Sequence, residues 1–533
     1  MATKLSTATM TSTAPAPTPG DAARSEPPPL TKIVATIGPA SESQAVLERL
    51  IDAGASVFRL NFSHGTTDEH KRRLDAIREA AKAKGVCVGV LGDLPGPKIR
   101  VGTVPDLDGS GGVELVPGQN VLLDRTVTDA EIREETVDTL CERVPVLPLT
   151  YGDLVDEVEP GQRVLINDGA VRMLAVGAEP GGQAVRCVVT LGGVVTTRKG
   201  INLPETNLSV PALTDRDREL VSWAVANGID YLALSFVRSG KEIEELRDLI
   251  VAEAPDHEPI PIIAKIEKPQ ALSRIEEIAE VSDAIMVARG DLGVEMDIPE
   301  VPPAQKRIIA AAGHWGKPCI VATQMLETMI DSPIPTRAEA SDVANAIFDR
   351  AGAVMLSGET AVGKHPALVV ETMARIARAT EEALANGERA ASPPQRLKQT
   401  RYRTAALAHG AWHMVQDLDA RAIVCWSQLG GTARYLSQND FDIPIVAWSS
   451  DPRATRRMAL LRGVRPVLAD PPESGRLAEW TDMVEAHLLS HNWARAGDQV
   501  LLVAGRPLGG ARVVNSLSVL EVGDPTGGYR DHH

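Results

Sequence analysis

Eight short apolar runs, each followed by a helical pattern, limit the folds open to this sequence more than any other feature. The runs lie at 31–37, 55–62, 86–94, 229–236, 260–267, 284–289, 318–324 and 353–357. Segments between them, such as 41–53, carry apolar residues at helical spacing, and Thr336 with Glu339 predicts a capping box. Alternating strands and helices form a parallel sheet, and eight units are expected to close into a (β/α)8 (TIM) barrel of the α/β class. The alternative, an open doubly wound sheet, lacks its usual glycine motif here.

Two further regions differ from the barrel pattern. Residues 98–211 separate the third and fourth runs and carry Pro/Gly turns with short β-like stretches, which predicts an inserted β-rich lid. The segment at about 397–523 again has an α/β pattern. The predicted domains are a disordered extension at 1–29, the barrel at 30–97 and 212–380, the lid at 98–211, and a C-terminal α/β domain with a short tail at 381–533.

Composition and charge limit the partners and the compartment. The chain carries a net charge of −16, which disfavours a nucleic-acid-binding surface, because such a surface needs a concentration of Lys and Arg. The five cysteines are scattered and form no CxxC pair, which indicates a reduced protein without a zinc site. No apolar run approaches the roughly 18 residues of a membrane span. We therefore expect a cytoplasmic protein that binds neither nucleic acid nor a membrane.

Polar side chains gather at the ends of the predicted strands, where the active site of a (β/α)8 barrel lies. Because side chains alternate between the faces of a strand, Arg59, Asn61 and Ser63 are expected to share the inward face of the second strand. Lys265 and Glu267 project together from the fifth strand in the same way. Other strands end at Asp93, Asp291, Thr323 and Ser357. The inward alternation favours a functional site over a solvated rim with a weak ion pair.

The residue types at these strand ends suit phosphoryl chemistry beside a metal. Two carboxylates without a nearby His or Cys, Glu267 and Asp291, suit Mg²⁺, with Mn²⁺ as an alternative; Mg²⁺ takes its other ligands from water and substrate phosphate. Lys265 beside that metal is costly unless an anion lies between them, and a transferring phosphoryl group fits this requirement. Arg59 can hold phosphate oxygens through its planar guanidinium. Thr323 can carry or relay a proton, although a threonine at a strand end is usually a simple strand former.

Several long segments resemble the pyruvate kinase family, whose members pass phosphate from phosphoenolpyruvate to ADP. The matching stretches occur in family order over 31–380, with weaker similarity to about 523. They are TKIVATIGPAS (31–41), RLNFSHG (59–65), KGINLP (199–204), KIE (265–267), MVARGDLGVE (286–295), ATQMLETM (322–329), PTRAEASDVANAI (335–347) and MLSGETAVG (355–363). The resemblance implies a catalytic barrel, a lid, a regulatory C-terminal domain and a homotetramer.

The resemblance also implies a role for each matching residue. Lys265 would stabilise the phosphoryl group in flight, and Glu267 and Asp291 would hold the Mg²⁺ that also binds phosphoenolpyruvate. Arg59 would hold the substrate phosphate, with Lys265 and Ser357 also in the substrate site. The region of Gly290 and Asp291, together with Thr323, would hold the carboxylate end, and Thr323 would lie near the face where the enolate is protonated. The nucleotide phosphates of ADP or ATP would contact Asn61, His64, Arg100 and Lys199.

One departure from the family pattern concerns potassium. Members that need K⁺ ligate it at the positions of Asn61, Ser63, Asp93 and the Leu94 carbonyl, and they usually carry Glu where this chain has Lys98. Because Lys98 can place its own ammonium near this monovalent site, we expect that K⁺ is not required.

The C-terminal domain and the activity leave alternatives open. Its loop of Ser427, Gly430, Gly431 and Thr432 suits a phosphorylated effector, although Leu429 stands where relatives that bind a sugar bisphosphate have a second hydroxyl. An ordinary strand–helix turn is the alternative for this loop. For the whole chain the alternatives are a Mg²⁺-dependent barrel lyase or aldolase acting through a pyruvate enolate, and a catalytically silent metabolite sensor.

Overall fold

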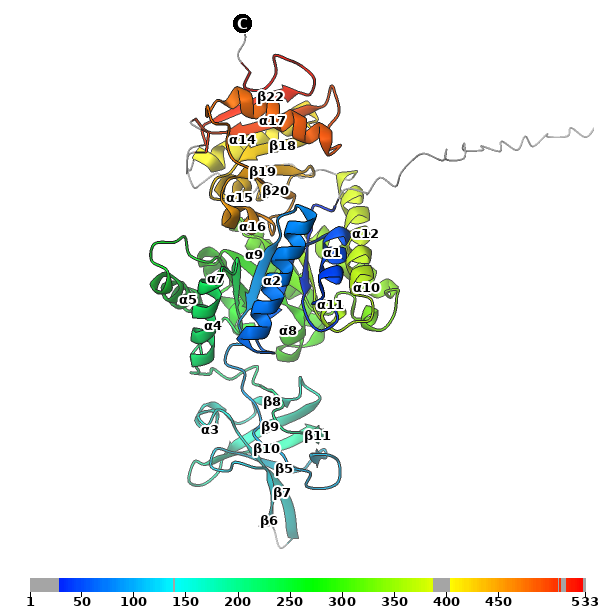
Figure 1. Cartoon of the computed structure of the whole chain (residues 1–533). Coiled ribbons are helices and arrows are strands. Elements are labelled where there is room, and N and C mark those ends of the chain that lie inside the picture. Colours follow the sequence, from blue (N-terminus) through cyan, green and yellow to red (C-terminus); the bar gives the residue numbers. More distant parts are fainter. Residues whose placement is uncertain (1–27, 138–139, 387–402, 507, 510–513, 531–533) are drawn as a thin grey trace, which may run out of the picture.

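The computed structural model describes residues 28–137, 140–386, 403–506, 508–509 and 514–530, so the predicted extension at 1–29 lies almost wholly outside the described residues. Three units follow one another along the long axis of the molecule (Figure 1). An antiparallel-rich β unit lies at one end, a barrel lies in the middle, and an α/β unit lies at the other end.

Eight parallel strands close into the central barrel in the order β1-β17-β16-β15-β14-β13-β3-β2. Their bounds are Lys32–Thr36 (β1), Ala55–Asn61 (β2), Gly89–Asp93 (β3), Tyr231–Leu234 (β13), Ile262–Ile266 (β14), Ala284–Ala288 (β15), Cys319–Ala322 (β16) and Ala353–Leu356 (β17). Each strand falls within one of the eight apolar runs, and the predicted (β/α)8 fold is confirmed.

Helices surround the barrel in Figure 1. They are α1 (Gln44–Ala53), α2 (Thr67–Lys84), α4 (Asp215–Ala226), α5 (Gly240–Glu253), α6 (Pro269–Ser273), α7 (Ile275–Val281), α8 (Arg289–Glu295), α9 (Val301–His314), α10 (Arg337–Phe348), α11 (Gly358–Ala361) and α12 (Pro366–Ala385), with 3-10 turns η1 (Ile298–Glu300) and η2 (Glu327–Ile330). The predicted capping box opens α10, where the Thr336 side chain accepts a hydrogen bond from the Glu339 N–H.

The period of two along each strand separates two apolar layers. Phe58 and Leu60 of β2 belong to the core between the strands and the helices. Val57 belongs to the interior of the barrel, together with Leu91 and Ile263. Arg59, two residues beyond Val57, therefore points inward, and Lys265 does so beyond Ile263. The interior is apolar near the N-terminal ends of the strands and ionic near their C-terminal ends.

A second unit is inserted between β3 and β13. A seven-stranded sheet has the order β12-β8-β9-β10-β5-β7-β6, and a two-stranded sheet pairs β11 with β4. The bounds are Val113–Leu115 (β4), Asn120–Asp124 (β5), Glu131–Val137 (β6), Leu140–Pro148 (β7), Arg163–Ile166 (β8), Val171–Ala178 (β9), Ala184–Leu191 (β10), Gly193–Val195 (β11) and Ile201–Asn202 (β12), with a short helix α3 (Leu154–Glu157). We call this unit the lid.

The C-terminal unit is a five-stranded sheet of order β20-β19-β18-β21-β22, in which only β22 is antiparallel to its neighbour. Its elements are α14 (Arg403–Leu418), β18 (Ala422–Trp426), α15 (Gly431–Ser437), β19 (Ile445–Ser449), α16 (Pro452–Met458), β20 (Val464–Leu468), α17 (Leu477–Ser490), β21 (Gln499–Ala504) and β22 (Ser516–Glu521). Among the described helices, none is long and apolar enough to cross a membrane.

The C-terminal unit closes the N-terminal end of the barrel. Leu460, just after α16, is fully buried and packs in the same cluster as the barrel-interior residues. Arg456 forms an ion pair with Asp230 at 2.8 Å, and the Gly463 N–H donates to the Leu30 carbonyl at 2.8 Å. The opposite end of the barrel, where the polar strand ends converge, therefore faces the lid.

Candidate active site

The Lys265 ammonium lies at the centre of a buried ionic cluster. Its Nζ is 2.8 Å from Glu267 Oε1 and 3.2 Å from Asp93 Oδ1, and it donates to Ser235 Oγ at 2.7 Å. Burial alone would lower the pKa of Lys265, but the charges of Asp93 and Glu267 outweigh it and raise this pKa above its usual range. The ammonium is therefore charged and fixed in direction before any ligand arrives.

Glu267 lies just beyond β14, and Asp291 lies in the first turn of α8 after the adjacent strand β15. Glu267 is 1% exposed and accepts a hydrogen bond from the Phe236 N–H at 2.7 Å. Burial raises the pKa of Glu267 to about 7; Lys265 opposes this shift, and the negative charge of Asp291 adds to it. Two carboxylates that repel each other in a desolvated site are suited to share a cation.

Arg59 connects β1, β2 and β3 on the inward side of the barrel. Its Nε donates to Asp93 Oδ2 at 2.7 Å, and its Nη1 donates to Thr36 Oγ1 at 3.2 Å. Burial opposes ionisation of Asp93, yet the charges of Lys265 and Arg59 hold its pKa below the usual range. Asp93 thus orients two cations, both directed toward the space at the strand ends.

Thr323 follows β16 in a conformation that a β-branched residue rarely adopts, with φ of +68°. Its Oγ1 accepts a hydrogen bond from the Gly290 N–H at 2.7 Å and donates to the Ala322 carbonyl at 2.6 Å. Arg289 holds the same turn, because its Nη2 donates to the Thr323 carbonyl at 2.7 Å while its Nη1 pairs with Asp342. Strain maintained by surrounding contacts is typical of a functional site.

The residues expected to contact a nucleotide lie at two places. Asn61 is the last residue of β2, and its Oδ1 accepts a hydrogen bond from the Ser63 N–H at 3.2 Å; His64 lies in the turn that follows and is exposed. Arg100 and Lys199 lie on the two chain segments that enter and leave the lid, which pair antiparallel through Arg100 and Gly200. The structure thus brings Arg100 and Lys199 together.

At the expected monovalent site, the Leu94 carbonyl accepts a hydrogen bond from Ser235 Oγ at 2.7 Å. The Lys98 ammonium faces the lid, at 3.8 Å from Asp168 Oδ1. The loop that carries Asp168 lies close to α8, because a Cβ placed on the next residue, Gly169, would lie 3.8 Å from the Val294 side chain. Lys98 therefore bridges the barrel and the lid loop that reaches the helix carrying Asp291.

The remaining predicted site residues are partly or wholly buried. Ser357 follows β17, and its Oγ is buried without a hydrogen-bond partner among the described residues. In the C-terminal unit, Ser427 and Thr432 are 2% and 7% exposed, and Ser427 Oγ accepts from the Ala433 N–H at 3.1 Å. Gly430, with φ of +81°, and Gly431 complete the turn between β18 and α15. Effector binding at this loop stays a prediction.

Sequence reasoning missed two residues of the cluster. Ser235 lies just beyond β13 and connects Lys265 to the Leu94 carbonyl. Arg289 holds the Thr323 turn and was not predicted as a site residue. The sequence could have indicated Ser235, because it is a polar residue at the end of the fourth apolar run, and polar residues at the ends of the other runs were predicted as site residues.

A (β/α)8 barrel with ionisable side chains buried at the C-terminal ends of its strands has the architecture of a barrel enzyme. Residues 29–370 match the family described as pyruvate kinase, barrel domain, and residues 405–520 match pyruvate kinase, alpha/beta domain. The chain belongs to the pyruvate kinase family, whose members are phosphotransferases.

Relatives named pyruvate kinase align over most of the chain. The protein from Mycobacterium intracellulare is 40% identical over 92% of this chain and 98% of its own length. The one from Corynebacterium efficiens is 40% identical over 93% of this chain and 98% of its own length. The one from Sporosarcina psychrophila is 38% identical over 93% of this chain and 80% of its own length.

Proposed function

We propose that this protein transfers the phosphoryl group of phosphoenolpyruvate to ADP, giving pyruvate and ATP. The observation that carries the proposal is the buried ammonium of Lys265, fixed beside Glu267 and Arg59 in a member of this family. A transferring phosphoryl group needs positioning and charge neutralisation more than covalent chemistry. A rigid, desolvated pair of cations supplies both.

The transfer breaks the bond between phosphorus and the enol oxygen while a terminal phosphate oxygen of ADP bonds to phosphorus. Lys265 and Arg59 hold the oxygens of the moving group, and Ser357 contributes to the substrate its hydroxyl, which has no hydrogen-bond partner among the described residues. Thr323 and the Gly290–Asp291 turn hold the carboxylate end, with Thr323 near the carbon that is then protonated. The nucleotide phosphates contact Asn61, His64, Arg100 and Lys199, and the lid excludes water from the closed site.

The carboxylates of Glu267 and Asp291 would hold Mg²⁺, with Mn²⁺ as an alternative. They fit a hard cation because both offer oxygen ligands, follow the adjacent strands β14 and β15, and are partly or wholly buried. Within the described ranges no group of three or more His, Cys, Asp or Glu is arranged to hold a metal. Mg²⁺ commonly takes its remaining ligands from water and substrate phosphate, and it would supply further charge neutralisation.

We also propose that K⁺ is not required, because Lys98 stands where K⁺-dependent relatives usually have a carboxylate. The Asn61, Ser63, Asp93 and Leu94 positions would otherwise ligate K⁺. In the structure, Lys98 pairs with Asp168 of the lid, which draws its ammonium toward the lid. Whether Lys98 replaces K⁺ is therefore tested with a variant of Lys98 itself.

The test follows pyruvate formation from phosphoenolpyruvate and ADP with Mg²⁺, in K⁺ and in a K⁺-free buffer. We expect equal rates in both buffers, a loss of at least about 10³-fold in Lys265→Met, and K⁺ activation in Lys98→Glu. Lys241→Met, which removes an exposed lysine, serves as the control.

Each other outcome is informative. Activity only with K⁺ would keep the transfer reaction and refute the role of Lys98. Folded protein that binds Mg²⁺ but forms no pyruvate in either buffer would contradict the proposed function and favour a lyase or a metabolite sensor.

A further inference from the structure

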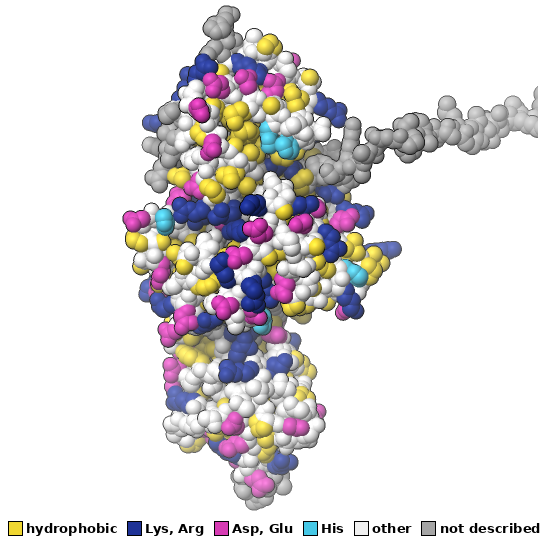
Figure 2. Space-filling model, viewed as in Figure 1, with side chains coloured by type: hydrophobic (Ala, Val, Ile, Leu, Met, Phe, Trp, Pro, Cys, Tyr) yellow, Lys and Arg dark blue, Asp and Glu magenta, His cyan; other side chains and the backbone are white. Residues whose placement is uncertain are grey.

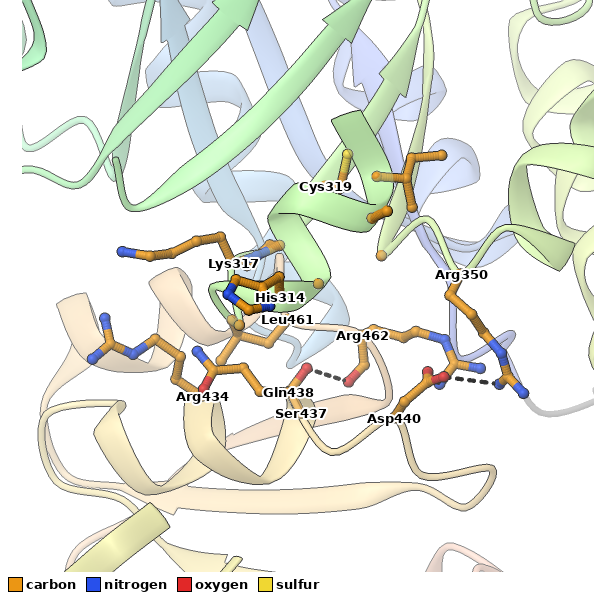
Figure 3. A pocket seen from close by; sticks show the side chains of 16 residues that line it. His314, Lys317, Cys319, Arg350, Arg434, Ser437, Gln438, Asp440, Leu461 and Arg462 are labelled. Carbon is orange, nitrogen blue, oxygen red and sulfur yellow. Dashed lines mark hydrogen bonds and ion pairs between the residues drawn. The ribbon is translucent and has the colours of Figure 1, made fainter. Parts of the chain in front are cut away.

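A cavity of about 460 Å³ lies between the barrel and the C-terminal unit, at the end of the barrel opposite the proposed active site. The C-terminal half of α9 and the segment leading into β16 form its barrel wall, and α15 with the loop before β20 forms the other wall (Figure 3). Its volume falls in the range of small-molecule sites. None of the residues proposed for phosphoryl transfer lines it.

The cavity is rich in positive charge in a protein whose net charge is −16. Lys and Arg side chains also gather along this domain boundary on the face shown in Figure 2. The lining carries the cations Lys317, Arg350, Arg434 and Arg462 and the single carboxylate Asp440. An acidic protein that concentrates cations in one cavity there favours an anionic occupant.

The cations fall into two groups. Arg350 and Arg462 are neutralised, because they pair with Asp440 at 3.1 and 2.7 Å and also approach Asp442. Lys317 and Arg434 extend to the other side of the cavity, one from each wall (Figure 3). Lys317 donates to the carbonyls of Glu280 and Ser282, and within the described part of the chain neither Lys317 nor Arg434 forms an ion pair.

Unsatisfied polar atoms mark the same side. Arg434 Nε, on α15, and Gln438 Oε1, at the C-cap residue of this helix, are buried without a hydrogen-bond partner among the described residues. Burial lowers the pKa of Lys317 to about 8; Asp283 opposes this shift and the positive charge of Arg434 adds to it. A bound anion would pair with both cations and relieve their repulsion.

The remaining lining is mixed: Ile309, Pro318 and Leu461 are apolar, and His314, Ser437 and Gln438 add polar side chains without a formal charge. A ligand that matches this lining carries a compact dianion at one end and an uncharged body at the other. A phosphate monoester has this form, and its oxygens can accept from an Arg fork and a Lys ammonium together.

We propose that this cavity binds a small organic phosphate between Lys317 of the barrel and Arg434 of the C-terminal unit, and that the ligand changes the activity of the barrel. The link is short. Cys319, the first residue of β16, lines the cavity, and Thr323 follows the same strand four residues later, roughly 13 Å away. A ligand that draws the two walls together therefore acts on the strand that carries the strained Thr323 turn.

The test uses phenyl phosphate, a phosphate ester with an apolar ring, and isothermal titration calorimetry on the full chain. We expect saturable binding to the unaltered protein, at least tenfold weaker binding to Lys317→Gln and Arg434→Gln, and weaker binding of inorganic phosphate. Gly313→Phe places a large side chain at the cavity wall, where a Cβ meets no atom within 4 Å, and is expected to abolish binding. Gly313→Ala and Lys241→Gln are the matched controls and should bind normally.

Equal binding by the unaltered protein, Arg434→Gln and Gly313→Phe would overturn the site, and so would absence of binding to the unaltered protein. The effect on activity rests on the proposed function, whereas the calorimetry does not. Phenyl phosphate should shift half-saturation by phosphoenolpyruvate at least twofold in the unaltered protein and not in Gly313→Phe. Binding without any shift would overturn the regulatory part alone, and a failure of the proposed function would leave the binding result intact.

Discussion

Each buried charge of the candidate site has a partner that also directs it. Asp93, which is 2% exposed, contacts both Arg59 and Lys265, and Ser235 Oγ accepts a hydrogen bond from the Lys265 ammonium. Burying a charge without such partners would cost several kcal/mol. The same contacts that make the burial tolerable therefore fix the directions of both cations, which is the arrangement that transition-state stabilisation requires.

Ser235→Ala tests whether the fixed direction of the Lys265 ammonium contributes to catalysis. The variant removes the hydroxyl between Lys265 and the Leu94 carbonyl and leaves every charge in place. We expect kcat to fall about 10- to 100-fold, with KM for phosphoenolpyruvate changed less, and a loss of stability of about 1–3 kcal/mol. Steady-state kinetics and denaturant unfolding measure these effects, with the exposed Ser273→Ala as the control. An unchanged kcat would leave Ser235 a purely structural residue.

The residues of the ionic cluster that sequence analysis identified lie on or just after barrel strands whose alternation is visible in the sequence, whereas Arg100 and Lys199 lie on the segments that enter and leave the lid. Lys265 and Glu267 were recognisable because an inward charge interrupts an apolar strand. Arg289 was not recognisable in this way, because it donates hydrogen bonds to the carbonyls of Thr323 and Gln324, some 34 residues away in sequence. Contacts to distant backbone atoms leave no pattern in side-chain periodicity, and the strain at Thr323 has no sequence signature either.

At the scale of elements, a buried polar network joins the lid to the helix that carries Asp291. Glu295, the last residue of α8, is 1% exposed and accepts hydrogen bonds from Asn202 of β12 at 2.8 Å and from Lys268 at 3.0 Å. Lys268 follows Glu267 directly. The network therefore connects the lid to the segments that bear both proposed metal ligands.

Replacing Glu295 alone should be costly, since it leaves Lys268 as an unpaired buried cation. We expect Glu295→Met to lose about 3–5 kcal/mol of stability and Lys268→Met/Glu295→Met to recover part of it. Denaturant unfolding measures the stability, and hydrogen exchange of β12 reports the attachment of the lid. The exposed Glu300→Met is the control. A double variant no more stable than Glu295→Met would show that the network is not a coupled unit.

β1 carries a buried lysine whose titration should influence stability. Lys32 donates to the Val464 carbonyl; burial lowers its pKa to about 7, the charge of Arg465 adds to this shift, and Glu381 opposes it. Between pH 7 and about 10 the unfolded chain holds a proton that the folded protein lacks, so this residue makes stability rise with pH, by at most roughly 1.4 kcal/mol per pH unit. Lys32→Met should remove that slope.

Thermal unfolding at pH 7 and pH 10 checks this expectation. The midpoint of Lys32→Met relative to the unaltered protein should be higher at pH 7 than at pH 10. Lys241→Met, which removes an exposed lysine, should show no such difference. A difference between the variant and the unaltered protein that does not change with pH would contradict the buried titration.

For the molecule as a whole, the two ends of the barrel are engaged by the lid and the C-terminal unit, and an exposed apolar surface remains on its side. Ile334 and Val362 are 71% and 62% exposed. They lie on neighbouring segments, because the Lys364 N–H donates at 2.9 Å to the carbonyl of Ile330, the last residue of η2. Exposed apolar side chains that cluster in this way are typical of an interface between protein copies.

The homotetramer expected from the family resemblance would cover this surface. Charges introduced there should prevent association, because burying an unpaired carboxylate opposes an apolar contact. We expect sedimentation velocity to show tetramers for the unaltered protein and smaller species for Ile334→Asp/Val362→Asp. Ile298→Asp, at an isoleucine 74% exposed in η1, is the matched control and should still assemble. If the double variant also forms tetramers, the copies must meet elsewhere, and the side of the barrel would then be free to bind another partner.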